Sequence, residues 1–223
     1  MKKVPSYPWE PLARKFVAEF LGTFTLALVI QVISFGTANY PGAFQALYVP
    51  FLAGLTLAFL VAVLGGVSGA NFNPAVSIGL FAVRKLTAIQ LAVYLVAQVA
   101  GAFAALQGVK YLVGAAEPLT AQATSYVWWG ESFGAFVLVL GIMATIQGRL
   151  KPAAAAPVIG AGLAIGVALS QLSSGGVLNP AIALSLGVRS LPYLLAPIIG
   201  ACVAAVLYTY VLSEAPVAVG EEA

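Results

Sequence analysis

Long apolar stretches separated by short polar segments run through the whole sequence. Six of them reach about 20 residues, the length that a helix needs to cross roughly 30 Å of hydrocarbon. They lie at 16–36, 46–66, 86–108, 128–148, 153–172 and 191–212. The pattern predicts an all-α membrane protein with six transmembrane helices, which form a single membrane domain over residues 1–223.

Two further apolar stretches, 74–83 and 180–188, are too short to cross a bilayer. Each begins within the tripeptide Asn-Pro-Ala and follows a run rich in glycine and serine. Asparagine is a good N-cap and proline suits the first helical position, so each tripeptide predicts a helix start. A short helix behind irregular backbone at membrane depth is typical of a re-entrant half-helix. The two tripeptides are Asn73, Pro74, Ala75 and Asn179, Pro180, Ala181.

The two halves of the chain repeat one another. Residues 14–110 and 126–212 each contain three long stretches and one short one, and the segment around Glu19 is echoed by the segment around Glu131. Because each half has an odd number of spans, the second half must be inverted relative to the first. The half-helices then enter from opposite faces, and the two Asn-Pro-Ala ends meet near the midplane. The sequence therefore predicts an inverted 3+3 repeat.

The composition agrees with a membrane protein and excludes several functions. Hydrophobic residues make up 61% of the chain and charged residues 8%, whereas charged residues are about a quarter of a soluble domain. The chain has no histidine, no aspartate and one cysteine, Cys202. We therefore expect no metal site, no cofactor, no intrachain disulfide and no catalytic centre, so the chain is not predicted to be an enzyme. The net charge of +3 is expected to reflect contact with the cytoplasm, with no nucleic acid as partner.

The N-terminal segment and the basic residues predict how the chain lies in the membrane. Prolines at positions 5, 8 and 11, in place of a short apolar core, predict that no signal peptide is cleaved. With a cytoplasmic N-terminus, eight basic residues face the cytoplasm and only Lys110 and Arg189 face outside, which follows the positive-inside bias. Both termini are therefore predicted to be cytoplasmic. The eight are Lys2, Lys3, Arg14, Lys15, Arg84, Lys85, Arg149 and Lys151.

The sequence resembles the aquaporin (major intrinsic protein) family from about residue 14 to 212. The segments that carry the resemblance are 18–24, 68–77, 97–102 and 174–181. It implies an hourglass of six tilted helices and two half-helices, with one pore in each subunit of a homotetramer in the plasma membrane. Members of this family conduct water, and some conduct glycerol, ammonia or other small neutral solutes. The resemblance thus implies that water and small neutral solutes, together with the lipid bilayer, are the partners of this chain.

Five polar residues are candidates for roles in such a pore. We expect the amides of Asn73 and Asn179 to donate hydrogen bonds to a passing oxygen, while the two helix N-termini oppose cations. The simpler alternative is that both asparagines only cap buried helices. Glu19 and Glu131 lie within apolar spans, and the resemblance implies that each accepts N–H groups of the backbone before a half-helix. A proton relay, the alternative, would need titrating partners that the sequence lacks. Gln98 is expected to be a buried hydrogen-bonding group.

The position after the second Asn-Pro-Ala departs from the family. Most aquaporins have an arginine there, which narrows the outer pore, whereas this chain has Ile182. Counting back from the motifs places the other filter positions at Ala53, Val167 (Ala168 if the register slips by one) and Gly176. This set has no charge, no aromatic ring and no side-chain hydrogen bond. We expect an outer filter that is wider or less polar than that of a water channel, or one that opposes flow by dewetting.

Three functions are compatible with these features. A passive channel for water and small uncharged solutes is favoured. A weakly selective pore for ions or protons is an alternative because the filter arginine is missing. A structural membrane tetramer with a closed pore is a third possibility, although the short loops offer little surface to a partner.

Overall fold

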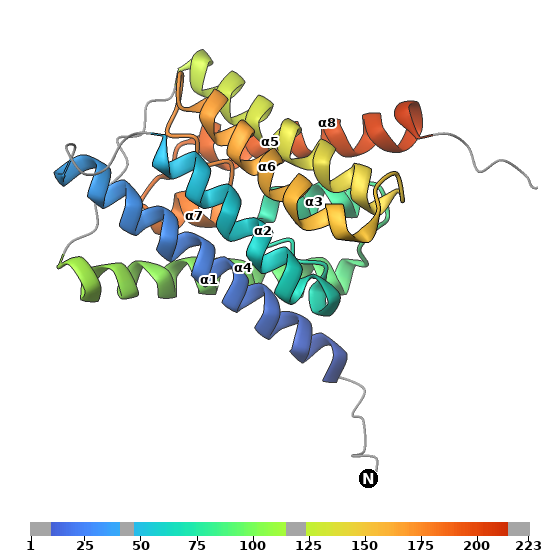
Figure 1. Cartoon of the computed structure of the whole chain (residues 1–223), viewed down its shortest axis with the longest axis horizontal. Coiled ribbons are helices and arrows are strands. Elements are labelled where there is room, and N and C mark those ends of the chain that lie inside the picture. Colours follow the sequence, from blue (N-terminus) through green and yellow to red (C-terminus); the bar gives the residue numbers. More distant parts are fainter. Residues whose placement is uncertain (1–9, 41–46, 115–123, 214–223) are drawn as a thin grey trace, which may run out of the picture.

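The computed structural model describes residues 10–40, 47–114 and 124–213, and within these ranges the chain is helical with irregular connections and no strand (Figure 1). The long helices carry the labels α1, α2, α4, α5, α6 and α8, and two short helices, α3 and α7, lie between them. Their bounds are α1 Glu10–Asn39, α2 Tyr48–Ser68, α3 Pro74–Ala82, α4 Ala88–Val113, α5 Ser125–Ile146, α6 Pro152–Ser170, α7 Pro180–Ser185 and α8 Leu191–Leu207, and a π-helical turn at Tyr208–Leu212 follows α8.

The prediction of six membrane-spanning helices is confirmed. Within the described residues, six helices are long and apolar enough to cross a bilayer, and each overlaps one predicted span. The bounds differ most in α1, which begins at Glu10 where residue 16 was predicted, and in α4, which ends at Val113 where residue 108 was predicted. Apolar content marks the part of a helix that lies in hydrocarbon, and a helix can continue beyond it into the polar interface. The sequence pattern therefore located the spans but not the helix ends.

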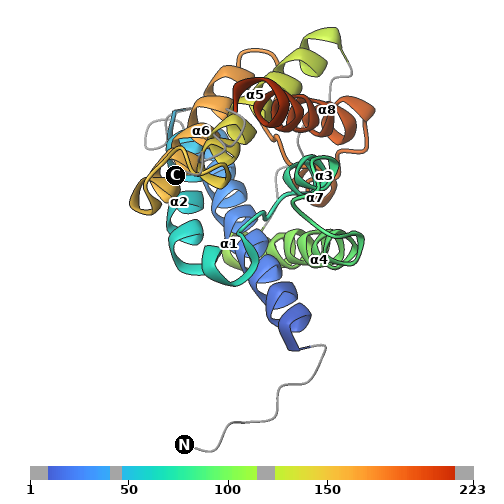
Figure 2. The same cartoon turned by 90° about the vertical axis from the view of Figure 1, so that its right-hand side faces the viewer.

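The six long helices form a ring, which is visible when the molecule is viewed nearly along the helices (Figure 2). Around this ring α4 packs on α1, α1 on α2, α2 on α6, α6 on α5, and α5 on α8. The two short helices complete it, because α3 packs on α8 and α7 packs on α4. Each short helix thus rests on a long helix from the other half of the chain. The element order α1–α4 is repeated as α5–α8, in agreement with the predicted 3+3 repeat.

Neither short helix can cross a membrane. The nine residues of α3 and the six residues of α7 rise by about 14 Å and about 9 Å, against roughly 30 Å of hydrocarbon. Their predicted starts are confirmed, with proline at the first helical position of each. Their predicted ends were slightly late, since α7 ends at Ser185 and not at residue 188.

Small residues let the ring helices approach closely. A Cβ atom added to Gly54 of α2 would overlap the carbonyl oxygen of Gly160 in α6, and one added to Gly160 would overlap that of Gly54. A Cβ atom on Gly200 of α8 would likewise overlap the carbonyl oxygen of Ser132 in α5. Because lipid tails are as apolar as the helices, such close packing is a main source of association between membrane helices.

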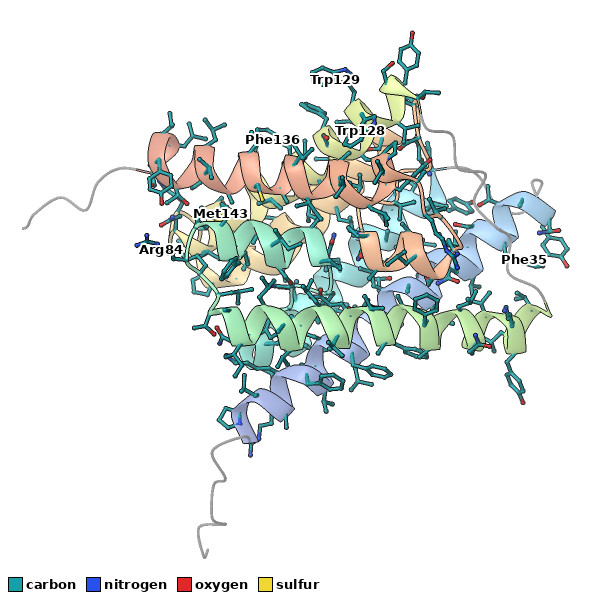
Figure 3. All side chains as sticks on the ribbon, turned by 180° about the vertical axis from the view of Figure 1, so that it is seen from behind. Phe35, Arg84, Trp128, Trp129, Phe136 and Met143 are labelled. Carbon is teal, nitrogen blue, oxygen red and sulfur yellow. The ribbon has the colours of Figure 1, made fainter. Side chains whose placement is uncertain are left out.

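The outside of the ring is covered by large apolar side chains. Phe59 of α2 is 62% exposed and Val96 of α4 is 62% exposed, whereas Glu19 and Glu131 are fully buried. Trp129, near the start of α5, is 76% exposed (Figure 3), as expected of an aromatic residue at a membrane interface. The molecule is therefore apolar towards lipid and carries its polar groups in its centre.

The contact at Gly200 provides a test of the packing. We expect Gly200→Ala to lower the free energy of unfolding by about 1–3 kcal/mol, because the added methyl group forces the backbones of α8 and α5 apart. The matched control is Gly66→Ala in α2, where an added Cβ atom meets nothing within 4 Å. Thermal unfolding in detergent should show a lower midpoint for the first variant and no loss for the second. Equal midpoints would contradict the packing described.

Candidate functional site

The two short helices meet at their N-termini in the centre of the ring, where their asparagines are joined by a reciprocal pair of hydrogen bonds. Nδ2 of Asn73 donates to the carbonyl oxygen of Leu178 at 2.8 Å, and Nδ2 of Asn179 donates to the carbonyl oxygen of Phe72 at 2.9 Å. Each asparagine thereby binds the residue directly before the other asparagine. The sequence predicted that the two ends meet but not that they bond to each other.

The same asparagines cap the helices that they begin. Oδ1 of Asn73 accepts from the N–H of Ala75 at 2.8 Å, and Oδ1 of Asn179 accepts from the N–H groups of Ala181 at 3.1 Å and Ile182 at 3.4 Å. A primary amide has two N–H donors, and one in each asparagine is used in the reciprocal pair. One N–H of each asparagine therefore remains to donate elsewhere.

The backbone before each short helix adopts the same unusual conformation. Ala70 and Phe72 have φ angles of 56° and 53°, and the equivalent residues before the second helix, Gly176 and Leu178, have 62° and 53°. This left-handed region costs a residue with a side chain about 1–2 kcal/mol. Two such residues in alternation expose several N–H groups that neither helix can satisfy, so other groups must hold this backbone.

In the second half, Glu131 of α5 holds this backbone. Its Oε1 accepts from the N–H of Val177 at 3.0 Å, and its Oε2 accepts from the N–H of Leu178 at 2.7 Å. The hydroxyl of Ser174 also donates to Oε1 at 2.7 Å. Glu131 is fully buried, so these donors take the place of water around its carboxyl group. The same segment is also held by Tyr193, whose hydroxyl accepts from the N–H of Gly175 at 3.1 Å.

In the first half, Glu19 of α1 makes the same contacts. Its Oε1 accepts from the N–H of Asn71 at 3.0 Å and from the hydroxyl of Ser68 at 2.6 Å, and its Oε2 accepts from the N–H of Phe72 at 2.7 Å. Gln98 of α4 adds a fourth donor, with Nε2 at 2.8 Å from Oε2. The hydroxyl of Tyr94 donates to the carbonyl oxygen of Ser68.

A further polar network is present in the first half. Nδ2 of Asn71 donates to Oγ of Ser77 at 3.1 Å, and Nε2 of Gln98 donates to the same oxygen at 2.9 Å. Asn71 was not among the residues singled out from the sequence. Its signal was present, because asparagine stands two residues before Asn73 whereas valine stands two residues before Asn179.

A small central chamber lies where the two asparagines meet. Its volume is about 20 Å³, which is room for a single water-sized molecule. Asn71, Asn73 and Asn179 form its polar part, and the rest of its wall is apolar. The apolar residues are Leu26, Ile30, Leu57, Leu138, Leu163, Val167, Val177 and Ile182.

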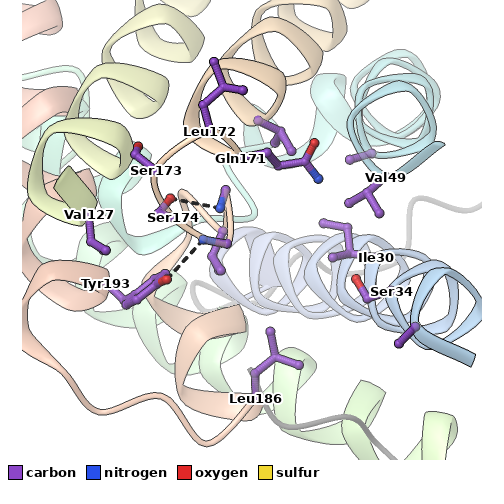
Figure 4. A pocket seen from close by; sticks show the side chains of 16 residues that line it. Ile30, Ser34, Val49, Val127, Gln171, Leu172, Ser173, Ser174, Leu186 and Tyr193 are labelled. Carbon is purple, nitrogen blue, oxygen red and sulfur yellow. Dashed lines mark hydrogen bonds between the residues drawn. The ribbon is translucent and has the colours of Figure 1, made fainter. Parts of the chain in front are cut away.

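A larger vestibule of about 530 Å³ lies on the side of the ring where α1 ends and α2 and α5 begin (Figure 4). Its polar wall includes the irregular segment 173–176, where the hydroxyl of Ser174 accepts from the N–H of Gly176 at 3.0 Å, together with Ser34, Gln171 and Tyr193. Ile30, Val167 and Val177 line both the vestibule and the chamber. These three residues form an apolar ring segment between the two spaces. We refer to them as the collar.

Comparison with known proteins agrees with this arrangement. A model of the major intrinsic protein family matches residues 8–208, which is most of the chain. The chain belongs to this family. It is therefore a membrane channel and not an enzyme.

Individual members of the family align over nearly their whole length. Aquaporin AqpM of Methanothermobacter marburgensis is 28% identical, with 91% of this chain and 99% of that protein covered. Aquaporin Z of Brucella melitensis is 31% identical, with 91% and 100% covered. The X-ray structure of the aquaglyceroporin from Plasmodium falciparum has a TM-score of 0.75 at 25% identity, with 90% of this chain and 97% of that chain covered.

The four filter positions that the family resemblance singled out do not all lie in one place. Ala53 and Gly176 line the vestibule alone, whereas Val167 lines both the vestibule and the chamber. Ile182 lines the central chamber, and only 1% of its surface is exposed. Counting residues from the motifs could not show this division, because it depends on how deep each side chain lies in the pore. Ile30 is a lining residue that the counting missed, since it comes from α1, a helix that carries no filter position.

Ile30 belongs to a regular row of lining residues on α1. Leu26, Ile30, Ser34 and Ala38 are four residues apart, which places them on one helix face. The row runs from the chamber through the collar to the vestibule. Ser34 and Ala38 line the wide vestibule, Leu26 lines the chamber, and Ile30 lines both. A row of this spacing is visible in the sequence, but within an apolar helix it does not stand out.

The buried carboxyl groups provide a test of the loop structure. We expect Glu131→Gln to lower the free energy of unfolding by about 1–3 kcal/mol, because an amide nitrogen would face a backbone N–H in place of an acceptor. The control is Ser173→Ala in the same segment, which removes only a 3.3 Å hydrogen bond to the carbonyl oxygen of Ser170. Thermal unfolding in detergent should separate the two variants. If both unfold at the wild-type temperature, the carboxyl group does not hold this loop.

Proposed function

We propose that the chain is a passive channel that conducts water and small uncharged solutes along a path through its own ring of helices. The observation that carries this proposal is the central chamber, where the free N–H groups of Asn73 and Asn179 meet a space for one water-sized molecule. A solute oxygen there would find these two donors, and apart from Asn71 the rest of the wall is apolar. The names of the relatives, two aquaporins and an aquaglyceroporin, support water and glycerol-like solutes.

The same chamber would oppose cations. Both half-helices direct their N-termini to it, and each helix end is equivalent to up to about half a positive charge. No charged residue lines the chamber or the vestibule among the described residues, so a cation would find no carboxylate to replace its water. Leaving water for an apolar space without a counter-ion is costly. Exclusion of ions therefore needs no arginine after the second Asn-Pro-Ala.

The collar favours small or weakly hydrated neutral solutes. Ile30, Val167 and Val177 offer no side-chain hydrogen bond, so a solute gives up part of its hydration to pass them. The alternative of a pore for ions or protons rests on the lack of a charged filter, since Ile182 stands where most family members have arginine. A current in a planar bilayer under a potassium gradient would favour that alternative, and its absence would reject it.

We further propose that the protein is a homotetramer in the plasma membrane with both termini in the cytoplasm. The described chain begins and ends on one side of the ring, since α1 starts and α8 ends there (Figure 1). Arg84 lies at this same end of the molecule (Figure 3), as the positive-inside bias requires of a cytoplasmic face. Lys2 and Lys3, which also support this orientation, lie outside the described residues. Chemical crosslinking in detergent would test the subunit number.

Osmotic shrinkage of vesicles tests the channel itself. We expect vesicles that contain the purified protein to shrink faster than empty vesicles when the outside osmolarity rises, because water leaves through the pore. Uptake of glycerol and ammonia, measured in the same vesicles, ranks the solutes by their permeability. Rates that equal those of empty vesicles for water, glycerol and ammonia alike would reject the proposal and favour a structural role with a closed pore.

Blocking the collar tests where the path lies. We expect Val167→Trp to reduce water permeability to within about twofold of the empty-vesicle value, because the indole fills the space between the vestibule and the chamber. Val96→Trp is the control, since Val96 is 62% exposed on the outside of α4 and its replacement should leave permeability unchanged. Wild-type permeability in a folded Val167→Trp variant would place the path elsewhere.

A further inference from the structure

The four filter positions carry no polar side chain, but a polar side chain lies directly beside two of them. Gln171 follows α6, and its amide extends into the vestibule (Figure 4). A Cβ atom added to Gly176 would lie 3.1 Å from Cγ of Gln171 and 3.3 Å from Cγ1 of Val167. The stem of Gln171 therefore packs next to the collar, in the room that the missing side chain of Gly176 leaves.

Gln171 has a counterpart on α1. Gln171 stands four residues after Val167, and Ser34 stands four residues after Ile30, so each lies about one helical turn, or about 6 Å, beyond a collar residue. Val167 and Ile30 line both the vestibule and the chamber, whereas Gln171 and Ser34 line the vestibule alone. Gln171 and Ser34 thus add polar groups on the vestibule side of the apolar collar. We refer to these two residues as the outer step.

The fold itself does not call for polar side chains at these two positions. Neither the amide of Gln171 nor the hydroxyl of Ser34 has a hydrogen-bond partner among the described residues. The position that matches Gln171, eight residues before the first motif asparagine, is Gly65. The position that matches Ser34, fifteen residues after the second buried glutamate, is Ile146. Since the other half is built without these polar groups, the outer step points to a role in what passes the vestibule.

The outer step offers hydrogen bonds of both kinds. A primary amide has two N–H donors and a carbonyl acceptor, and a hydroxyl group has one donor and two lone pairs. All of these groups are free of protein partners within the described residues. The step can therefore bind a hydroxyl group of a solute, as donor or as acceptor, while the rest of that solute enters the collar.

Water and larger solutes depend on such a step to different degrees. A water molecule in a narrow pore keeps hydrogen bonds to the waters before and behind it, so it needs little from the wall. A polyol fills the cross-section and excludes water from its sides, so its hydroxyl groups must find partners on the wall or remain without them. The loss of a partner on the wall therefore costs a polyol more than it costs water.

We infer that Gln171, together with Ser34, determines specificity by providing the hydrogen bonds that a polyol-sized solute needs at the entrance to the apolar collar. The outer step then raises the permeability of such a solute relative to that of water. The inference rests on the proposed channel function and concerns the choice among its solutes. The polar part of the outer filter thus comes from α6 and α1, at positions that counting from the motifs does not reach.

Substitution of Gln171 tests this inference through the ratio of glycerol to water permeability in the same vesicles, with empty-vesicle values subtracted. This ratio does not depend on how many channels insert, and water flow shows that a variant is folded. We expect Gln171→Met, which is nearly as long but has no donor and only a weak acceptor, to lower the ratio about three- to tenfold, as expected for the loss of about one net hydrogen bond. Gln171→Asn, which keeps the amide on a shorter stem, should lower it less than twofold.

The control is Thr37→Val, at the same end of α1. Thr37 is not among the residues that line the vestibule, and its hydroxyl donates to the carbonyl oxygen of Ile33 at 3.0 Å, so the ratio should stay within twofold of wild type. An unchanged ratio in Gln171→Met, an equal fall in both Gln171 variants, or wild-type vesicles that conduct water but not glycerol would overturn the inference and leave the channel intact. Wild-type vesicles that conduct neither water nor any of the tested solutes would instead reject the channel function.

Discussion

Backbone polar groups in the middle of a membrane must find partners inside the protein, and most of this structure follows from that constraint. Two irregular segments reach the centre of the ring, and water is not available there to satisfy their N–H groups. Glu19 and Glu131 provide the acceptors, which explains why carboxyl groups occur in otherwise apolar helices. The position of α1 and α5 is then fixed, because each must bring its glutamate to one loop. The close helix contacts at Gly54, Gly160 and Gly200 hold the remaining helices around this centre.

The overall fold could be predicted from the sequence because it depends on local sequence patterns. Span length follows from the thickness of hydrocarbon, and the half-helix starts follow from the capping chemistry of Asn73 and Asn179 and the prolines after them. The inverted orientation of the second half relative to the first followed from the odd number of spans in each half. The site was only partly accessible. The reciprocal bonds from Asn73 to Leu178 and from Asn179 to Phe72 join distant segments, and no local pattern encodes which carbonyl oxygen is reached.

The depth of each lining residue was the other feature that sequence reasoning could not give. Ala53 and Gly176 line the wide vestibule, whereas Ile182 lines the chamber, although all were assigned to one filter. Spacing along the chain determines which face of a helix a residue occupies. Its depth in the pore also depends on the tilt of that helix and on the irregular backbone before the short helices. Asn71 was missed for a different reason. The difference between Asn71 and Val177 is visible in the sequence, but only the structure shows that both residues line the same small chamber.

The reciprocal asparagine bonds also have a consequence for biosynthesis. They connect residues 105 and 107 positions apart, and α3 packs on α8 while α7 packs on α4. A nascent chain that has inserted only α1 to α4 therefore holds half of a chamber, with the Asn73 amide still without its partner. The chain must be made at least as far as Leu178 before this amide can be satisfied, and such long-range contacts form slowly. Until then, the polar N-terminal end of α3 lacks the partner that the second half provides, so the first half alone leaves this N–H group unsatisfied by the protein.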